Sequence, residues 1–371
     1  EPPRQPMQCL LHSEYQILLD LCLQKGLLIQ LLSQHIQNKK ELKKRIQEDN
    51  TPRTTVSFYR YVIIDNPTEL RNKLFLQWNE LNVLGRIYVA REGINAQMSV
   101  PTQHWETFKQ LLDEDDRFCA MPLKIAVEDN GKSFYKLTIK VRPKIVADGL
   151  DDDAFDVTNV GNHLSAKEFN EAMDLPGTVV VDMRNVYESE VGHFKGAILP
   201  KSVTFRDELD EVLGLLNESK DKKILMYCTG GVRCEKASAY LRHHGFKDVN
   251  QLNGGIIYYA QQIREQGLEP EFIGKNFVFD ERMGERITPD IISKCHQCGT
   301  PCDHHTNCAH QGCHVLFIQC PDCAAKMDAC CSEACKSIVA LPEEEQKEIR
   351  KKHPARDVKN KYRPVIGKIN S

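Results

Sequence analysis

The feature that most constrains the fold is a six-residue loop, because the sequence predicts a strand before it and a helix after it. A short apolar run at Lys223–Tyr227 is typical of a buried strand. It leads into Cys228-Thr-Gly-Gly-Val-Arg233 and then into a helix. A strand followed by a tight turn and a helix is typical of a doubly wound α/β domain, whose ligands bind at the carboxyl ends of the strands. The loop therefore predicts a fold class and the place of a site, with Cys228 at its centre.

The composition of the loop favours a reactive thiolate. Adjacent glycines let the backbone turn sharply, and its N–H groups form an anion nest at the positive end of the following helix. A thiol in such a nest has a lowered pKa, so a nucleophile is present at neutral pH. We interpret Cys228 as catalytic, and Arg233 as either a stabiliser of charge or a staple for the loop. Ligand or cofactor binding is assigned to the residues between them, Thr229, Gly230, Gly231 and Val232.

The sequence leaves other interpretations of Cys228 and of the nearby Cys234 open. A cysteine in a tight turn is often only structural, but here strand, cysteine, glycines, arginine and helix coincide. Cysteine-dependent phosphatases use a similar nest with a C-x5-R loop, whereas four residues separate Cys228 from Arg233. The tighter cradle suits a terminal sulfur better than a tetrahedral phosphate. Cys234, on the first turn of the helix, is a further catalytic candidate that resolves an oxidised Cys228 as a disulfide, or else a packed helix cysteine.

The order of elements predicts a multidomain chain that combines α/β and α+β folds. A β-α-β-β-α-β order, typical of a ferredoxin-like (acylphosphatase-like) domain, precedes the α/β domain. Either residues 123–127 or residues 135–141 are expected to close its sheet. The expected segments are a helical extension, the ferredoxin-like domain, the α/β domain, a cysteine-rich metal module and a basic tail, at residues 1–51, 52–147, 148–272, 273–340 and 341–371.

The cysteine-rich module predicts bound metal. Of the 15 cysteines, ten lie between Cys295 and Cys335, and in a reducing compartment such a cluster indicates metal ligands before disulfides. Two C-x2-C knuckles each supply half of a tetrahedral zinc site. We predict structural zinc, with an iron–sulfur cluster as the less favoured alternative. The two expected ligand sets are Cys295, Cys298, Cys320 and Cys323, and Cys308, Cys313, Cys331 and Cys335.

Composition and charge add weaker expectations. The net charge of −3 gives no global sign of a polyanionic partner, although nine Lys or Arg residues lie between Lys347 and Lys368. Such a run binds nucleic acid or is only a solvated face. No apolar run is long enough to span a bilayer, and charged or polar residues interrupt the apolar stretch at residues 17–32. A cytoplasmic protein without a membrane partner is expected, and the sequence does not fix its oligomeric state.

Longer motifs carry a resemblance to a known family. Asp182-Met-Arg-Asn185 and the Cys228 loop resemble rhodanese domains, in which Asp182 and Arg184 would brace the loop. The order of six motifs resembles the bacterial oxygen-dependent tRNA uridine hydroxylases over residues 51–340. These motifs are Pro52-Arg-Thr-Thr-Val-Ser-Phe-Tyr59, Glu92-Gly-Ile-Asn-Ala-Gln97, Gly131-Lys-Ser-Phe134, Ile145-Val-Ala-Asp-Gly149, Cys228-Thr-Gly-Gly-Val-Arg-Cys-Glu-Lys236 and Gly274-Lys-Asn-Phe-Val-Phe-Asp-Glu-Arg-Met-Gly-Glu-Arg286.

The resemblance implies a function that the residues alone do not reach. Members of that family hydroxylate C5 of the wobble uridine in the tRNA anticodon loop, with molecular oxygen and an unidentified reductant, and Cys228 would be the catalytic cysteine. The alternatives are a sulfurtransferase that passes a persulfide sulfur from Cys228 to an acceptor, and a zinc-dependent RNA-binding protein with an inert loop. Intact Cys228 and Arg233 argue against the inert loop, and the ordered motifs favour the hydroxylase.

Overall fold

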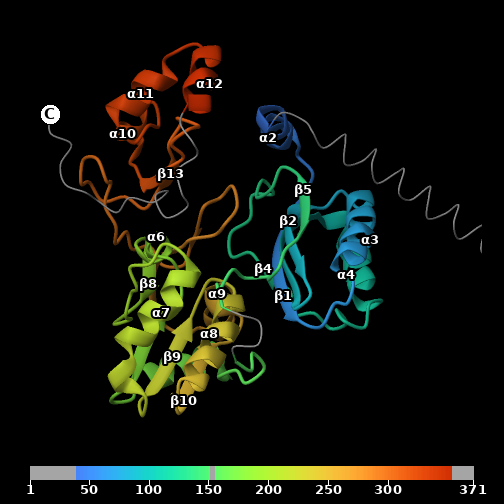
Figure 1. Cartoon of the computed structure of the whole chain (residues 1–371), viewed down its shortest axis with the longest axis vertical. Helices are drawn as coiled ribbons and strands as arrows, with labels where there is room; N and C mark the ends of the chain where they lie inside the picture. The colour runs from blue at the N-terminus through green and yellow to red at the C-terminus, as the bar shows by residue number, and fades with distance from the viewer. Residues whose placement is uncertain (1–38, 151–154, 353–371) are drawn as a thin grey trace, which may run out of the picture. The chain divides into compact units, whose positions relative to one another are not determined.

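The computed structural model describes residues 39–150 and 155–352, which form two compact units (Figure 1). The first unit holds most of the segment up to residue 145. The second holds the described residues from Val146 onward, together with two short pieces of the earlier chain, Val56–Tyr59 and Pro122–Asp129. Most of the predicted helical extension and of the predicted basic tail lie outside the described residues. Within those described, no helix is both long and apolar enough to cross a bilayer.

The first sheet has ferredoxin-like topology, as predicted. Its strand order is β4-β1-β3-β2-β5, and it is formed by β1 (Arg53–Tyr61), β2 (Leu84–Ala90), β3 (Gly93–Pro101), β4 (Lys124–Ile125) and β5 (Leu137–Val141). The two candidate closing strands both join this sheet, at opposite edges. The later one, β5, runs parallel to β2, whereas β4 pairs antiparallel with β1.

Two helices cover one face of this sheet (Figure 1). Helix α3 (Pro67–Glu80) begins where the Asn66 side chain accepts a hydrogen bond from the Glu69 backbone N–H, with proline at the first helical position. Helix α4 (Trp105–Asp113) follows a short 3₁₀ turn, η1 (Thr102–His104). Apolar residues at helical spacing turn inward, and the rings of Trp78 and Phe108 lie 5.9 Å apart between the two helices. A short helix, α2 (Lys39–Glu48), precedes β1.

The second unit is built on a parallel sheet of order β6-β10-β9-β7. Apolar side chains pack on both of its faces, so it is a doubly wound α/β domain, as predicted. Helices α7 and α8 cover one face, and α5 and α9 cover the other. The elements are β6 (Asn162–Leu164), α5 (Ala166–Met173), β7 (Val179–Asp182), α6 (Val186–Ser189), α7 (Phe205–Leu215), η2 (Asn217–Ser219), β9 (Lys223–Tyr227), α8 (Val232–His243), β10 (Asp248–Leu252) and α9 (Gly255–Gln266).

Shorter elements complete this unit. Strand β8 (Gly192–Phe194) pairs antiparallel with β11 (Phe272–Asn276), which also pairs with β12 (Glu285–Arg286). The cysteine-rich segment then forms a small hairpin and three helices. These elements are β13 (His305–Asn307), β14 (Leu316–Ile318), α10 (Pro321–Lys326), α11 (Glu333–Val339) and α12 (Glu343–Lys352).

Helix α9 begins directly behind the cysteine loop. Its first residue, Gly255, has φ of +67°, and a Cβ atom there would lie 2.5 Å from the carbonyl oxygen of Cys228. The next two backbone N–H groups, of Ile256 and Ile257, donate to the carbonyl oxygens of Cys228 and Thr229 at 3.0 and 3.2 Å. A glycine is therefore required for the helix to dock on the loop.

We predict that Gly255→Ala destabilises the domain more than Gly267→Ala does. Gly267 ends the same helix with φ of +63° and no atom within 4 Å of an added Cβ, so only the backbone conformation is disfavoured, by about 1–2 kcal/mol. At Gly255 the same conformational cost is joined by a clash with backbone that cannot move without breaking hydrogen bonds. Urea unfolding of both variants measures the difference, and equal losses would contradict the argument.

Candidate active site

Cys228 lies where the sequence places it, at the carboxyl end of β9 and before α8. Its side chain is fully buried, in an apolar cluster that also contains Cys234. Helix α8 begins at Val232, four residues after Cys228, so its first turn stands over the sulfur. The backbone N–H of Gly231 donates to Cys228 Sγ at 3.1 Å. Backbone N–H groups of Arg233 and Cys234 also donate to this sulfur.

This environment favours the thiolate of Cys228. Burial raises the pKa of the thiol, but the hydrogen bond from the Cys234 thiol, the charge of Arg233 and the backbone donors outweigh it and lower the pKa to about 5. The pKa of Cys234 moves the other way, well above its ordinary value, because of burial and because its proton bridges to Cys228. At neutral pH the pair holds one negative charge, on Cys228.

Arg233 holds the loop through a buried ion pair. Its guanidinium donates to both carboxylate oxygens of Glu188, at 2.6 and 2.8 Å, and to the Thr229 hydroxyl at 3.3 Å. The Thr229 hydroxyl in turn donates to Glu188 at 3.2 Å. In this geometry neither of the two roles predicted for Arg233 excludes the other. Arg233 ties the loop to helix α6, and its charge still lowers the pKa of Cys228.

The four residues between cysteine and arginine contribute unequally to the nest. Gly231 donates to the sulfur and adopts φ of +96°, which favours glycine. Thr229 is bound through its side chain to Glu188, and its carbonyl oxygen accepts from helix α9. Gly230 and Val232 are partly exposed. The backbone N–H groups that donate to the sulfur include those of Gly231, Arg233 and Cys234.

A second buried ion pair braces the strand beside the loop. Arg184 donates to both oxygens of Asp182, at 2.8 and 2.6 Å, and to the Gly192 carbonyl oxygen at 2.6 Å. The hydroxyl of Tyr227, the residue before Cys228, donates to the same carboxylate at 2.8 Å. Asp182 and Arg184 are both fully buried, and they connect β7, β8 and β9. Their contacts are those of supports for the site.

Sequence reasoning missed three residues that lie beside the loop within the second unit. The Tyr59 hydroxyl donates to Glu235 at 2.8 Å, and a Cβ atom on Gly231 would lie 2.8 Å from the Tyr59 oxygen. Lys124 Nζ lies 4.2 Å from the centre of the Tyr59 ring. Tyr59 and Glu235 stand in motifs that carry the family resemblance, which was a usable signal. Nothing near Lys124 in the sequence marks it.

Glu208, on α7, was also missed. It is fully buried, and neither carboxyl oxygen has a hydrogen-bond partner among the described residues. Burial raises the pKa of Glu208 well above its ordinary value, and the charges of Asp182, Glu188 and Cys228 raise it further against the opposing charge of Arg233. Glu208 is therefore a neutral acid in the core behind the loop.

The structure brings the terminal cysteines together in two groups of four. In each group the four sulfur atoms lie within 4.8 Å of one another, an arrangement that can hold a metal ion. Backbone N–H groups point at sulfur in both, from Cys320 to Cys295 at 3.3 Å and from Cys331 to Cys308 at 3.5 Å. Such N–H···S contacts and convergent thiols fit metal-bound thiolates. The groups are Cys295, Cys298, Cys320 and Cys323, and Cys308, Cys313, Cys331 and Cys335.

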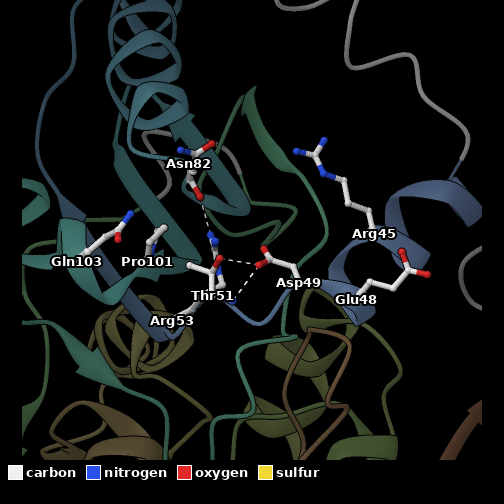
Figure 2. A pocket seen from close by; sticks show the side chains of 8 residues that line it. All are labelled: Arg45, Glu48, Asp49, Thr51, Arg53, Asn82, Pro101 and Gln103. Atoms are coloured by element: carbon white, nitrogen blue, oxygen red, sulfur yellow. Dashed lines mark hydrogen bonds between the residues drawn. The ribbon is translucent and has the colours of Figure 1, made fainter.

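A hollow in the first unit differs from the cysteine sites in the residues that line it. Figure 2 shows its lining residues, which come from the end of α2, the start of β1, the end of β3 and the adjoining loops. Its volume is about 500 Å³. Arg53 in its wall donates to the carbonyl oxygens of Asn82 and Ser99, and Asp49 accepts from Thr51. Its lining holds arginines and carboxylates but no cysteine or histidine. This hollow therefore offers none of the thiol chemistry that the sequence predicts at Cys228.

Known proteins resemble this chain along most of its length. Residues 53–145 match the family described as "UPF0176 acylphosphatase like domain", residues 165–262 "Rhodanese-like domain" and residues 273–336 "Rhodanase C-terminal". A Leptospira interrogans protein named tRNA uridine(34) hydroxylase is 58% identical over 90% of this chain and 92% of its own length. Proteins of that name from Photorhabdus laumondii and Pectobacterium carotovorum are each 56% identical, over 85% and 86% of this chain and 90% of their own lengths.

We predict that Cys228 titrates with a midpoint near pH 5. The measurement is thiolate absorbance against pH, taken as the difference between the natural protein and Cys228→Ser so that the other cysteines cancel. Cys234→Ala should move the midpoint upward, because the thiolate loses a hydrogen bond, whereas Cys119→Ser, at an exposed cysteine, should leave it unchanged. A midpoint near 9, the ordinary thiol value, would show that the nest does not stabilise the anion.

Proposed function

The chain belongs to the family of tRNA uridine(34) hydroxylases, and from this membership we propose that it hydroxylates C5 of the wobble uridine in tRNA. The observation that carries the proposal is the stabilised thiolate of Cys228 in a chain that is similar to these enzymes over about nine-tenths of its length. The co-substrates are molecular oxygen and a reductant. The sulfurtransferase alternative is not favoured, because the relatives that match the whole chain are named as hydroxylases.

The chemistry we propose begins with addition of the Cys228 thiolate to C6 of the uracil ring. C5 and C6 form an enone with the C4 carbonyl, so a new S–C6 bond makes C5 nucleophilic toward an oxidant. One oxygen atom of O₂ goes to C5 and the other leaves as water, with two electrons and two protons from the reductant. Loss of the C5 proton and cleavage of the S–C6 bond then release 5-hydroxyuridine and regenerate the thiolate.

Cys234 supports the nucleophile in this proposal. Its thiol donates to the Cys228 thiolate and lowers the pKa of Cys228. The same proximity suits it to resolve an oxidised Cys228 as a disulfide, which an external thiol would then reduce. Arg233 keeps the loop in shape and stabilises negative charge beside it.

The substrate in this proposal is the anticodon loop of tRNA. Its bases are already partly unpaired, so turning uridine 34 out of the stack requires little energy. Cys228 is buried, and the Tyr59 hydroxyl lies against Gly231, so entry of the base requires this ring to shift. Phosphate contacts by basic surfaces of the ferredoxin-like domain and the tail would dock the rest of the loop. A tRNA substrate supports our expectation that the protein acts in the cytoplasm.

We propose that the two cysteine groups hold structural zinc. Each supplies four thiolates, which completes tetrahedral coordination and leaves no open position for catalysis. Bound zinc would supply folding free energy to a module whose cores are themselves lined with cysteine. Iron is the alternative that elemental analysis distinguishes.

We predict that Cys228→Ser abolishes tRNA hydroxylation and leaves the fold and tRNA affinity intact, because serine is nearly isosteric but far less acidic. Nucleoside mass spectrometry of tRNA from a deletion strain that expresses each variant is the measurement. Cys234→Ser should give a smaller or reductant-dependent loss, and Cys119→Ser, at an exposed cysteine, none. Full restoration of hydroxylated uridine by Cys228→Ser would mean that the loop is only a scaffold.

We predict about two zinc ions per chain in protein purified without chelator, one for each cysteine group. Cys295→Ser and Cys308→Ser should each lower the content by about one. Cys302→Ser is the matched control, since Cys302 is buried in the same module but belongs to neither group. Elemental analysis that finds no metal, together with full thiol titration, would refute the assignment.

A further inference from the structure

Lys124 is a buried ammonium near the reactive cysteine that has no hydrogen-bonded or ion-paired partner among the described residues. Its side chain lies on β4 and is only 7% exposed. Among residues 39–150 and 155–352 it makes no recorded hydrogen bond or ion pair. Buried lysines are usually paired, because an isolated charge away from water is costly. A buried lysine beside a candidate site that lacks such a partner indicates that its counter-charge is supplied by the ligand, or by an intermediate that forms during the reaction.

The surroundings of Lys124 define where that charge would appear. Nζ lies 4.2 Å from the centre of the Tyr59 ring, and the Tyr59 hydroxyl touches both Glu235 and the turn at Gly231. The negative groups that act on Lys124 are Cys228 and Glu235. Helix α9 also packs on β4, but its nearby polar groups are engaged elsewhere. Gln261 donates to the Ile125 carbonyl oxygen and Arg264 to that of Val127.

Glu235 does not satisfy the ammonium. One of its oxygens accepts from Tyr59 and from His163, at 2.8 and 2.9 Å, and the other accepts from Gln251 at 3.0 Å. Burial raises the pKa of Glu235, but the hydrogen bond and charge of His163, with the bonds from Tyr59 and Gln251, outweigh it and keep the pKa below its ordinary value. This carboxylate is charged and already occupied by three donors.

We propose that Lys124 is a catalytic residue that binds the oxygen on C4 of uracil and stabilises the negative charge that develops there when Cys228 adds to C6. The inference rests on the function proposed above. As the S–C6 bond forms, the electron pair of the C5=C6 bond moves into the C4 carbonyl and makes an enolate. The ammonium donates a hydrogen bond to that oxygen and keeps its proton. The enolate returns to the carbonyl when C5 forms its bond to the oxidant. Loss of the C5 proton then forms the enolate again, and its collapse breaks the S–C6 bond and restores the carbonyl.

The charge states of the two groups support this role. Burial lowers the pKa of Lys124 to about 8, against the opposing effect of Cys228 and Glu235. The pKa of Cys228 is lowered to about 5. Between these values the thiolate and the ammonium coexist, so addition should be fastest there. It should fail below the lower value, where the thiol is protonated, and above the higher value, where the lysine is neutral.

The test is exchange of the C5 hydrogen of uridine 34 with deuterium from D₂O. Addition at C6 permits this exchange without oxygen or reductant, so it isolates the step in question. Full-length, metal-loaded protein is incubated anaerobically with unmodified tRNA, and nucleoside mass spectrometry follows the deuterium. We expect a bell-shaped dependence on pH with limbs near 5 and 8. Lys124→Gln should slow exchange at saturating tRNA by about 10²–10³-fold, as loss of one oxyanion donor does.

If the Lys124→Gln variant does not fold, the Lys124→Arg variant tests the same proposal. Arginine stays protonated, so the limb near pH 8 should disappear while the limb near 5 remains. Lys167→Gln, at an exposed lysine on α5, is the matched control and should exchange like the natural protein. Undiminished exchange by Lys124→Gln at saturating tRNA, with only weaker binding, would overturn the inference and indicate a phosphate contact. Absence of exchange in the natural protein would overturn the C6 addition itself.

Discussion

The ion pair between Arg233 and Glu188 is the interaction on which the candidate site depends. Both side chains are buried, and two short hydrogen bonds join them. Removal of one partner from a buried pair leaves the other charge uncompensated, which destabilises proteins by about 3–5 kcal/mol. The pair also fixes the Thr229 hydroxyl and ties the loop to helix α6. Because the carboxylate neutralises the guanidinium only in part, Arg233 still lowers the pKa of Cys228.

Short sequence patterns predicted those parts of the structure that depend on residues close together in the chain. The glycine turn between β9 and α8 and the knuckles of the terminal module are set by residues a few positions apart, and the predicted fold class is confirmed. The helix predicted to follow the loop begins inside it, at Val232, because the αL turn at Gly231 lets the helix start there. The choice between two closing strands was unnecessary, since a sheet with two free edges accepts one at each.

Contacts between distant segments were beyond prediction from one sequence. Glu188 meets Arg233 from 45 residues away, and Tyr59 meets Glu235 from 176 residues away. Neither spacing has a helical or strand period that would reveal it. The same limit applies to the four nest residues, since which backbone N–H groups point at a sulfur depends on dihedral angles. Gly231 donates to Cys228, whereas Thr229 is turned to Glu188.

These contacts between distant segments determine the arrangement of charge around Cys228. Asp182, Glu188 and Glu235 are each bound to donors, two of them to arginine, and Glu208 avoids a further negative charge by keeping its proton. A second uncompensated negative charge beside Cys228 would oppose formation of the enolate, so the protein holds one mobile negative charge, on the sulfur. Addition to a pyrimidine moves that charge from the thiolate to the carbonyl oxygen of the base. A fixed ammonium beside the site requires no reorganisation as the charge moves, and this preorganisation is what lowers barriers in buried sites. Lys124 is unpaired among the described residues for the same reason, because an ion pair with a carboxylate would have cancelled the field that the reaction uses.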